Sequence, residues 1–344
     1  MVRSAHVDIA QRGIRHLRDG SQDLVPSTVR VPASNYLDPA RWRREVERLF
    51  VRLPLVVGLS SELDGPGDAL TGEIVGTSYL VTRAGDGALC AEVASDDEAR
   101  SARAEERCGL VFLVLAERPS VDLDTALCGY AAPLDDLGLA SGRVVGRNVI
   151  AGPNWKLAYD GYLDYYHLPV LHRETFGPDM STQAMYDAWG PHQRVTAPDR
   201  HWGPLAEAAE EDWSLELLLG GVWTIFPHVS IASFDAGGKL HMISQLFPGR
   251  EVGASVTVQT FVAMFEPTAE HEALIAERMA FLEHVVRDED YFTGLRIQRA
   301  LATGARDHVL FGRNEGGGQR FHRWVDAILG ADDEELADLY AAGV

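Results

Sequence analysis

The stretch Asn154-Trp-Lys-Leu-Ala-Tyr-Asp-Gly-Tyr-Leu-Asp-Tyr-Tyr-His-Leu-Pro-Val-Leu-His172 decides how the rest of the chain is interpreted. It places Asp164, His167 and His172 in the spacing D-x2-H-x4-H. A helix is predicted over residues 155–166. On a helix Asp164 and His167 are i,i+3 neighbours, so the carboxylate can accept a hydrogen bond from one imidazole nitrogen and leave the other nitrogen for a metal.

His172 follows His167 by five residues, which places it about 140° further round an ideal helix. Pro169 is expected to end the helix, so that the chain turns and brings His172 back beside His167. Two imidazoles and one carboxylate with open coordination positions form the facial triad typical of non-haem Fe(II) oxygenases.

The carboxylate of such a triad has to come from elsewhere in the chain. Asp290 is the best candidate, at the expected start of a helical run toward Gln298, and Asp288 and Glu289 compete with it on chemistry alone. A plainer interpretation is that the histidines are polar residues at a helix end and that this acidic run is a solvated helix N-terminus.

The chain around this stretch changes its pattern several times. An arm at 26–36 has no clear period, and 95–107 is predicted to be a solvated turn of helix or a loop. The order of strands followed by helices predicts an α+β fold, in which helices cover one face of an antiparallel sheet. Helices are expected at 5–18, 39–50, 269–301 and 319–329, and strands at 55–59, 78–83, 110–116, 221–233, 239–247 and 255–265.

The composition excludes several classes of protein. The 344 residues carry 31 Lys+Arg against 51 Asp+Glu, a formal charge of −20, which disfavours binding to nucleic acid or to an anionic membrane. Three cysteines without a C-x-x-C pair fit neither a disulfide framework nor a zinc site, and they predict a reducing, cytoplasmic compartment. The N-terminus lacks the apolar stretch of a signal peptide, and no apolar run is long enough to span a bilayer.

Several motifs resemble the α subunits of Rieske-type aromatic-ring-hydroxylating oxygenases, and the resemblance extends over most of the chain. They are Asn154-Trp155-Lys156 before the D-x2-H-x4-H element, Phe226-Pro227 in an expected central strand, Glu289-Asp290 leading into the run from Ile297 to Ala305, and Phe311-Gly-Arg-Asn-Glu315, together with Arg44-Glu-Val-Glu-Arg-Leu-Phe50 and Gly109-Leu-Val-Phe112 in the N-terminal half.

The resemblance implies a fold, a division into domains and roles for named residues. The catalytic domain at 146–344 would be a helix-grip fold of the SRPBCC (Bet v1-like) kind, after N-terminal helices and an arm at 1–50 and a reduced β domain at 51–145. His167, His172 and Asp290 would ligate a mononuclear Fe(II). Asp164 would link an iron-bound histidine to the electron-donating cluster of the next subunit in a trimer.

The sequence departs from the family at the Rieske motif. A Rieske [2Fe–2S] centre needs the patterns C-x-H and C-x2-H. No histidine occurs between His16 and His167, Glu92 stands two residues after Cys90, and Val111 stands three after Cys108. We therefore expect no [2Fe–2S] cluster on this chain, and a β domain that is the remnant of a Rieske domain.

Two further departures fall near the expected pocket. Gly161 stands where relatives commonly place Asn, and His228 stands where Asn is usual. His228 is equally well interpreted as a strand histidine hydrogen-bonded within the sheet and as a residue that contacts substrate. Aromatic side chains available to line an apolar pocket are Tyr162, Tyr166, Trp223 and Phe226.

Three hypotheses for the function remain open. The first is a non-haem iron oxygenase for a small aromatic or hydrophobic substrate, with electrons from a separate ferredoxin, reductase or cluster-bearing subunit that docks on a basic patch near 41–52. The second is a metal-dependent hydrolase, hydratase or lyase that uses the triad as a Lewis acid. The third is a non-catalytic partner in a hetero-oligomer, against which the intact ligands argue. The general base of the second would be Asp160, Asp164 or His228.

Overall fold

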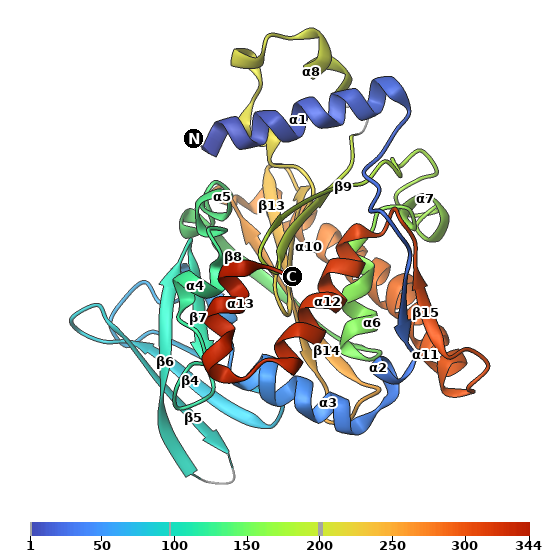
Figure 1. The fold of residues 1–344 in the computed structure, drawn as a ribbon. Coiled ribbons are helices and arrows are strands. Elements are labelled where there is room, and N and C mark those ends of the chain that lie inside the picture. Colours follow the sequence, from blue (N-terminus) through green and yellow to red (C-terminus); the bar gives the residue numbers. More distant parts are fainter. Residues whose placement is uncertain (1, 96–97, 199–201) are drawn as a thin grey trace.

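The computed structural model describes residues 2–95, 98–198 and 202–344. Figure 1 shows two antiparallel sheets side by side, with helices packed around the larger one. The α+β class predicted from the order of elements is confirmed. No helix among the described residues combines the length and the apolar character needed to cross a membrane.

The smaller of the two main sheets holds strands from the N-terminal half, in the order β2-β7-β6-β5-β4-β3 with every neighbouring pair antiparallel. Its outer hairpins project away from the body of the molecule (Figure 1). The strands are β2 (Leu55–Leu59), β3 (Ala69–Ile74), β4 (Thr77–Arg83), β5 (Leu89–Ser95), β6 (Glu98–Arg107) and β7 (Leu110–Val114).

The prediction of a loop or helical turn over 95–107 is wrong for the residues described there, because β6 is a ten-residue strand. Its backbone pairs with β5 on one side and β7 on the other, while most of its charged side chains stay at least partly exposed. No alternation of apolar and polar residues therefore marks it in the sequence. Residues 96 and 97 lie outside the described residues.

The larger sheet holds strands in the order β8-β14-β13-β12-β11-β10-β9, again all antiparallel. The predicted domain boundary at residues 145 and 146 falls inside β8. The strands are β8 (Arg143–Gly152), β9 (Met185–Trp189), β10 (His192–Thr196), β11 (Val222–Ile225), β12 (Val229–Asp235), β13 (Lys239–Pro248) and β14 (Ser255–Ala263).

The single strand predicted over 221–233 is two strands, β11 and β12, joined by a tight turn at Phe226-Pro227-His228. The expectation that Phe226-Pro227 lies within a central strand is therefore wrong. Pro227 has no backbone N–H to donate to a neighbouring strand, so a turn is the favourable place for it.

Each face of the larger sheet is covered differently. Met242 and Phe261 pack against the helix α10 (Ala269–His284) through Ile275 and Leu282. On the opposite face, Ile231 and Ile243 pack against residues of β2 and β7 and of two short helices. These helices are α4 (Leu123–Leu127) and α5 (Ala131–Asp135), so the larger sheet lies between α10 and the smaller sheet.

Helix α10 continues without a break through the π-helical segment Val285–Tyr291 into α11 (Phe292–Ala302). Asn148 of β8 donates to the Met279 carbonyl at 3.0 Å, and the Tyr291 and Thr257 hydroxyls bond at 2.5 Å. The first contact holds α10 against the sheet, and the second holds the end of the π-helical segment there. The helical region predicted at 269–301 is confirmed.

The N-terminal segments are tied to the C-terminal ones. Strand β1 (Val29–Pro32), in the predicted arm, pairs with β15 (His308–Phe311), and Asp38 caps α3 (Pro39–Glu45) by accepting from the Ala40 N–H at 2.8 Å. The remaining helices are α1 (Val2–Asp19), α2 (Ser34–Leu37), the π-helical Val46–Val51, α6 (Trp155–Asp160), α7 (Leu168–Leu171), α8 (Gly203–Glu207), α9 (Leu215–Leu218), α12 (Gly316–Gly330) and α13 (Leu336–Ala342).

Candidate metal centre

Three side chains from two parts of the chain converge beside the larger sheet. The Nε2 atoms of His172 and His167 lie 3.1 and 3.8 Å from Oδ1 of Asp290. One ligand atom from each residue lies within 4.8 Å of the others. Among the described residues, these three form the only cluster of three or more His, Cys, Asp or Glu side chains with ligand atoms this close together. The structure brings together the residues that the sequence proposed as ligands.

The local backbone that positions the histidines differs from the prediction. Helix α6 ends at Asp160, and Asp164 has an extended backbone, with φ −137° and ψ 165°. Pro169 lies in the first turn of α7 rather than at a helix end, and His167 and His172 flank this single turn. Proline is favourable in a first helical turn because its missing N–H is not needed there.

Each histidine is held at Nδ1 by a carboxylate. Asp164 accepts from His167 at 2.7 Å and Glu289 accepts from His172 at 2.6 Å. A carboxylate only accepts, so Nδ1 carries the proton and the lone pair of each neutral ring lies on Nε2, facing Asp290. This hydrogen bond between His167 and Asp164 was predicted. Its expected setting, a continuous helix, is wrong, because the backbone of Asp164 is extended.

The three consecutive acids 288–290 have three different environments. Asp288 is exposed, and hydrogen bonds from Arg287 and His284 lower its pKa to about 2. Glu289 contacts His172, and Asp290 faces both Nε2 atoms. All three lie in the π-helical segment, in the middle of a long helical run, so the solvated N-terminus interpretation is wrong, as is the expectation that Asp290 starts the run.

The electrostatics of His172 reflect its two acidic neighbours. Burial acts to lower the pKa of His172, but the hydrogen bonds and charges of Asp290 and Glu289 outweigh it and raise that pKa above its usual value. Such a ring exchanges a bound proton for a metal ion, because both need the Nε2 lone pair. The donor set of two imidazole nitrogens and a carboxylate oxygen fits a divalent transition metal.

Two cavities meet at these residues. One, of about 420 Å³, lies between the larger sheet and α10 and is called here the α10-side cavity; its walls include Phe234, Met242 and Leu282. The other, of about 550 Å³, is lined by residues of α6, α11, β15 and α12 and is called the α11-side cavity. Both cavities share the wall formed by Gly161, Tyr162, Asp164, His167 and Asp290.

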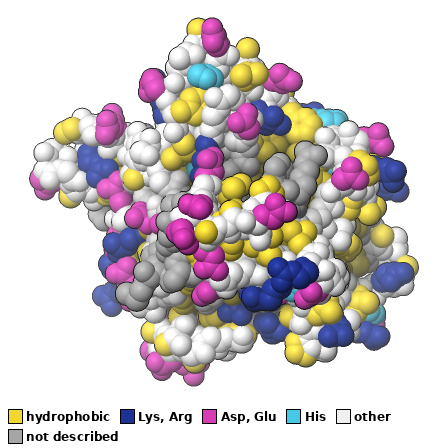
Figure 2. All heavy atoms as spheres, turned by 90° about the horizontal axis from the view of Figure 1, so that it is seen from above, with side chains coloured by type: hydrophobic (Ala, Val, Ile, Leu, Met, Phe, Trp, Pro, Cys, Tyr) yellow, Lys and Arg dark blue, Asp and Glu magenta, His cyan; other side chains and the backbone are white. Residues whose placement is uncertain are grey.

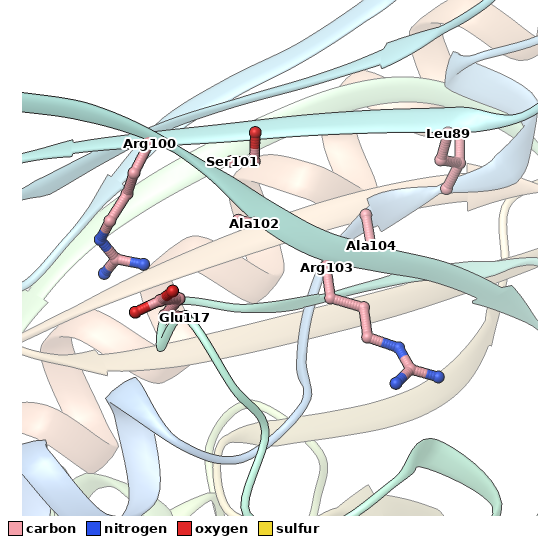
Figure 3. A pocket seen from close by; sticks show the side chains of 7 residues that line it. All are labelled: Leu89, Arg100, Ser101, Ala102, Arg103, Ala104 and Glu117. Atoms are coloured by element: carbon pink, nitrogen blue, oxygen red, sulfur yellow. The ribbon is translucent and has the colours of Figure 1, made fainter.

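A larger hollow, of about 720 Å³, lies elsewhere on the molecule. It follows β6, where Arg100 lies beside Glu117 and Arg103 lies further along the strand (Figure 3). None of its lining residues also lines either cavity beside the triad. Volume alone therefore does not identify the site, whereas converging donor atoms do.

Asp160, a candidate general base, lines the α11-side cavity and is already engaged. It accepts from the Tyr36 hydroxyl at 2.8 Å and from His322 Nε2 at 3.0 Å. Tyr36 is fully buried, and burial together with Asp160 raises its pKa well above the usual value. The contact joins the N-terminal arm to α6 and α12.

His228, the other candidate base, lies away from the triad. It is buried in the turn between β11 and β12, where its Nε2 accepts from the Val56 N–H at 3.1 Å. Burial lowers its pKa to about 3, and it lines neither cavity beside the triad. This geometry favours the interpretation of His228 as a structural histidine and not as a residue that contacts substrate. Its hydrogen bond is to β2 of the smaller sheet.

Sequence reasoning missed Glu289 as a partner of His172, and named it only as a competing ligand. The signal was its place next to Asp290 in an acidic run, but only the π-helical geometry shows that both neighbours reach one imidazole. Of the proposed pocket aromatics, Tyr162 lines both cavities and Tyr166 lines the α11-side cavity, whereas Trp223 and Phe226 are core residues.

Comparison with known proteins places the fold. The apo quaternary ammonium Rieske monooxygenase CntA aligns with 88% of this chain and 96% of its own, with 17% identity and a TM-score of 0.69. Naphthalene 1,2-dioxygenase from Rhodococcus sp., bound to indole, aligns with 96% and 100%, with 15% identity and a TM-score of 0.65. No curated protein sequence matches the chain significantly.

The family model for the ring hydroxylating alpha subunit (catalytic domain) matches residues 139–331. That range contains all three triad residues, both carboxylates at Nδ1, the larger sheet and the long helical run. The chain therefore belongs to the family of ring-hydroxylating oxygenase alpha subunits.

Proposed function

We propose that the chain is a mononuclear non-haem iron oxygenase that acts on a small hydrophobic or aromatic substrate. The observation that carries this proposal is the convergence of two Nε2 atoms and one carboxylate oxygen at the meeting point of two cavities. A ferrous ion held by such a triad supplies dioxygen activation at its open positions.

The residues around the triad support that chemistry. Asp164 and Glu289 fix both rings with Nε2 toward Asp290. Phe176, Met242 and Val285 give the α10-side cavity an apolar wall, which favours an apolar substrate and limits water beside the triad. Burial raises the pKa of Tyr162 to about 12, so its hydroxyl remains neutral between the two cavities.

The electrons for the reaction come, on this proposal, from a separate ferredoxin, reductase or cluster-bearing subunit. The support is the sequence, which has no histidine between positions 16 and 167 for the C-x-H and C-x2-H patterns. The smaller sheet is then the remnant of a Rieske domain. A trimer is proposed by analogy with the family.

The basic patch suggested for docking at 41–52 is partly neutralised by ion pairs. Arg41 pairs with Glu45 and Asp326, Arg48 pairs with Asp333, and Arg52 pairs with Glu47 and Asp333. Arg43 and Arg44 are exposed and form no ion pair among the described residues, so they are the part of the patch that remains open to a partner.

A Lewis-acid hydrolase or lyase is the competing function. It needs a general base beside the metal, and each candidate is engaged: Asp164 by His167, Asp160 by Tyr36 and His322, and His228 by the Val56 N–H. These contacts favour the oxygenase over the alternative.

The test is a substrate screen on the iron-loaded full-length chain, with and without dioxygen and with and without a reductant. Product formation is expected only when both dioxygen and electrons are supplied, and His167→Ala is expected to abolish it. Turnover without dioxygen or reductant would overturn the oxygenase proposal in favour of the alternative. Full activity in His167→Ala would overturn both.

A further inference from the structure

The α10-side cavity carries a basic side chain on its wall. Among the described residues that line this cavity, Arg278 of α10 is the only Lys or Arg. Arg278 also lines a neighbouring hollow of about 510 Å³, together with Asp235, Glu277 and Phe281, so its side chain lies at the border of the two spaces. Neither the family match nor the triad accounts for it.

Two contacts with residues of the neighbouring hollow hold Arg278 in position. Its Nε donates to the carbonyl of Asp235, at the end of β12, at 3.1 Å. Its Cζ lies 5.6 Å from the centre of the Phe281 ring, one turn further along α10. These two contacts orient the planar guanidinium without using its two terminal nitrogens.

Within the described part of the chain, Arg278 has no carboxylate partner within ion-pair distance, unlike Arg287 on the same helical run, which pairs with Glu283 and Asp288. Its two terminal NH2 groups remain available to a ligand. A guanidinium in that state matches a carboxylate with two parallel hydrogen bonds.

We propose that Arg278 selects the substrate by binding its carboxylate, while the apolar part of the same molecule extends along the cavity toward the triad. The substrate class is a small aryl or alkyl carboxylate, and a cavity of about 420 Å³ has the size of a small-molecule site. Oxygenation of this substrate rests on the proposed function, whereas binding of its carboxylate by Arg278 does not.

The test measures binding directly. Benzoate, phenylacetate and 3-phenylpropionate are titrated by calorimetry into the full-length chain, metal-free and loaded with Fe(II) under anaerobic conditions. Phenylacetamide and phenethylammonium serve as neutral and cationic counterparts. At least one carboxylate is expected to bind more tightly than both counterparts, in the metal-free protein as well, where it cannot coordinate a metal.

Substitution then assigns the selectivity to Arg278. In Arg278→Gln the carboxylate is expected to bind about 10- to 100-fold more weakly, as for the loss of hydrogen bonds to a charged group, with phenylacetamide changed less than twofold. Arg278→Lys is expected to restore part of the affinity. Arg287→Gln, on the same helical run but outside the cavity, is the matched control, and circular dichroism checks the fold of each variant.

The outcomes separate this inference from the proposed function. Absence of binding by all three carboxylates, tighter binding of phenethylammonium, or unchanged affinity in Arg278→Gln overturns the role of Arg278. Charge-selective binding that depends on Arg278, in a protein that turns over without dioxygen, overturns the oxygenase and leaves the carboxylate site standing.

Discussion

Neighbouring acids in the π-helical segment differ in role although they have the same chemistry. Asp290 faces both Nε2 atoms, whereas Asp288 bonds to Arg287 and His284 at the surface. Asp290→Asn is therefore expected to abolish stoichiometric Fe(II) binding, because it replaces the one anionic donor of the triad with a weak neutral one. Asp288→Asn is expected to bind Fe(II) as the unmodified protein does, by metal analysis after dialysis. Equal metal content in the two variants would contradict the assignment of Asp290.

Glu289 acts on the site through His172. It accepts from Nδ1 at 2.6 Å and also from the Thr175 hydroxyl at 2.9 Å. Removing the carboxylate in Glu289→Ala frees the ring to rotate or change tautomer, so the affinity for a divalent metal is expected to fall about 10- to 100-fold. Competition with a chromophoric chelator measures this loss.

Thr175→Ala is the control for Glu289, because it removes a bond to the carboxylate and leaves the carboxylate in place. A change of less than about threefold in metal affinity is expected there, well below the range for losing an outer partner of a metal ligand. An unchanged affinity in Glu289→Ala would show that His172 is oriented by packing against Phe176 alone.

The ligand set could be predicted because residue type and spacing carry it. The D-x2-H-x4-H element and the acids near 290 are visible in the sequence, and the structure brings them together. The choice of Asp290 among the three acids came from the family resemblance and not from residue type, and the role of Glu289 and the true place of Pro169 were not predicted. They depend on which way successive side chains point in a π-helical turn and on where one short helix begins.

Secondary structure elements were predictable where burial imposes a period. The amphipathic N-terminal helix and α11 follow from their patterns. Strand β6 does not follow from its pattern. Backbone pairing with β5 and β7 makes it a strand, while its side chains remain largely in contact with water. Its structure is imposed by neighbours in the sheet, and a local pattern cannot reveal that.

Helices α3 and α6 are joined by a buried charge cluster. Glu45, fully buried, accepts from Trp155 Nε1 at 3.0 Å and pairs with Lys156, whose pKa burial lowers although Glu45 opposes the shift. Glu45→Gln leaves the Lys156 ammonium without its counter-charge. The free energy of unfolding is expected to fall by about 3–5 kcal/mol, measured by chemical denaturation.

An exposed ion pair supplies the comparison for Glu45. The side chains of Arg143 and Glu266 are 64% and 78% exposed, and Glu266→Gln is expected to change the free energy of unfolding by less than about 1 kcal/mol. If both variants lost similar stability, burial would not be the reason that the Glu45 cluster matters.

At the scale of the whole molecule, the larger sheet is covered on both faces, and many of the charged side chains lie at the surface. Acidic side chains are spread over the face in Figure 2, as a net charge of −20 requires. The smaller sheet covers one face of the larger one, which gives it a structural role that does not depend on an electron-transfer cluster. On the proposal that the smaller sheet is the remnant of a Rieske domain, this packing gives a reason for its retention in a chain without the Rieske sequence pattern.

Enclosure of the larger sheet also buries histidines, and this sets the response to acid. Burial lowers the pKa of His228 to about 3 and those of His192 and His241 to about 4, whereas an unfolded histidine has a pKa near 6.5. Above about pH 6.5 these rings are neutral in both states and contribute no pH dependence. Below it the unfolded chain binds more protons, so each ring lowers the free energy of unfolding by up to about 1.4 kcal/mol per pH unit, down to its folded pKa.

His228→Gln isolates one of these contributions, because the amide oxygen of Gln can still accept from the Val56 N–H. Urea unfolding at pH 7.5, 6.5, 5.5 and 5.0 is expected to show a shallower loss of stability below pH 6.5 in the variant, by up to about 1.4 kcal/mol per pH unit. His172, with its raised pKa, acts in the opposite sense: in the metal-free protein its stabilisation is complete below pH 6.5 and is lost as the pH rises through its folded value. Since His172 is present in both proteins, it cancels in the difference. Parallel pH profiles would show that His228 is protonated in the folded state and that the turn between β11 and β12 admits water.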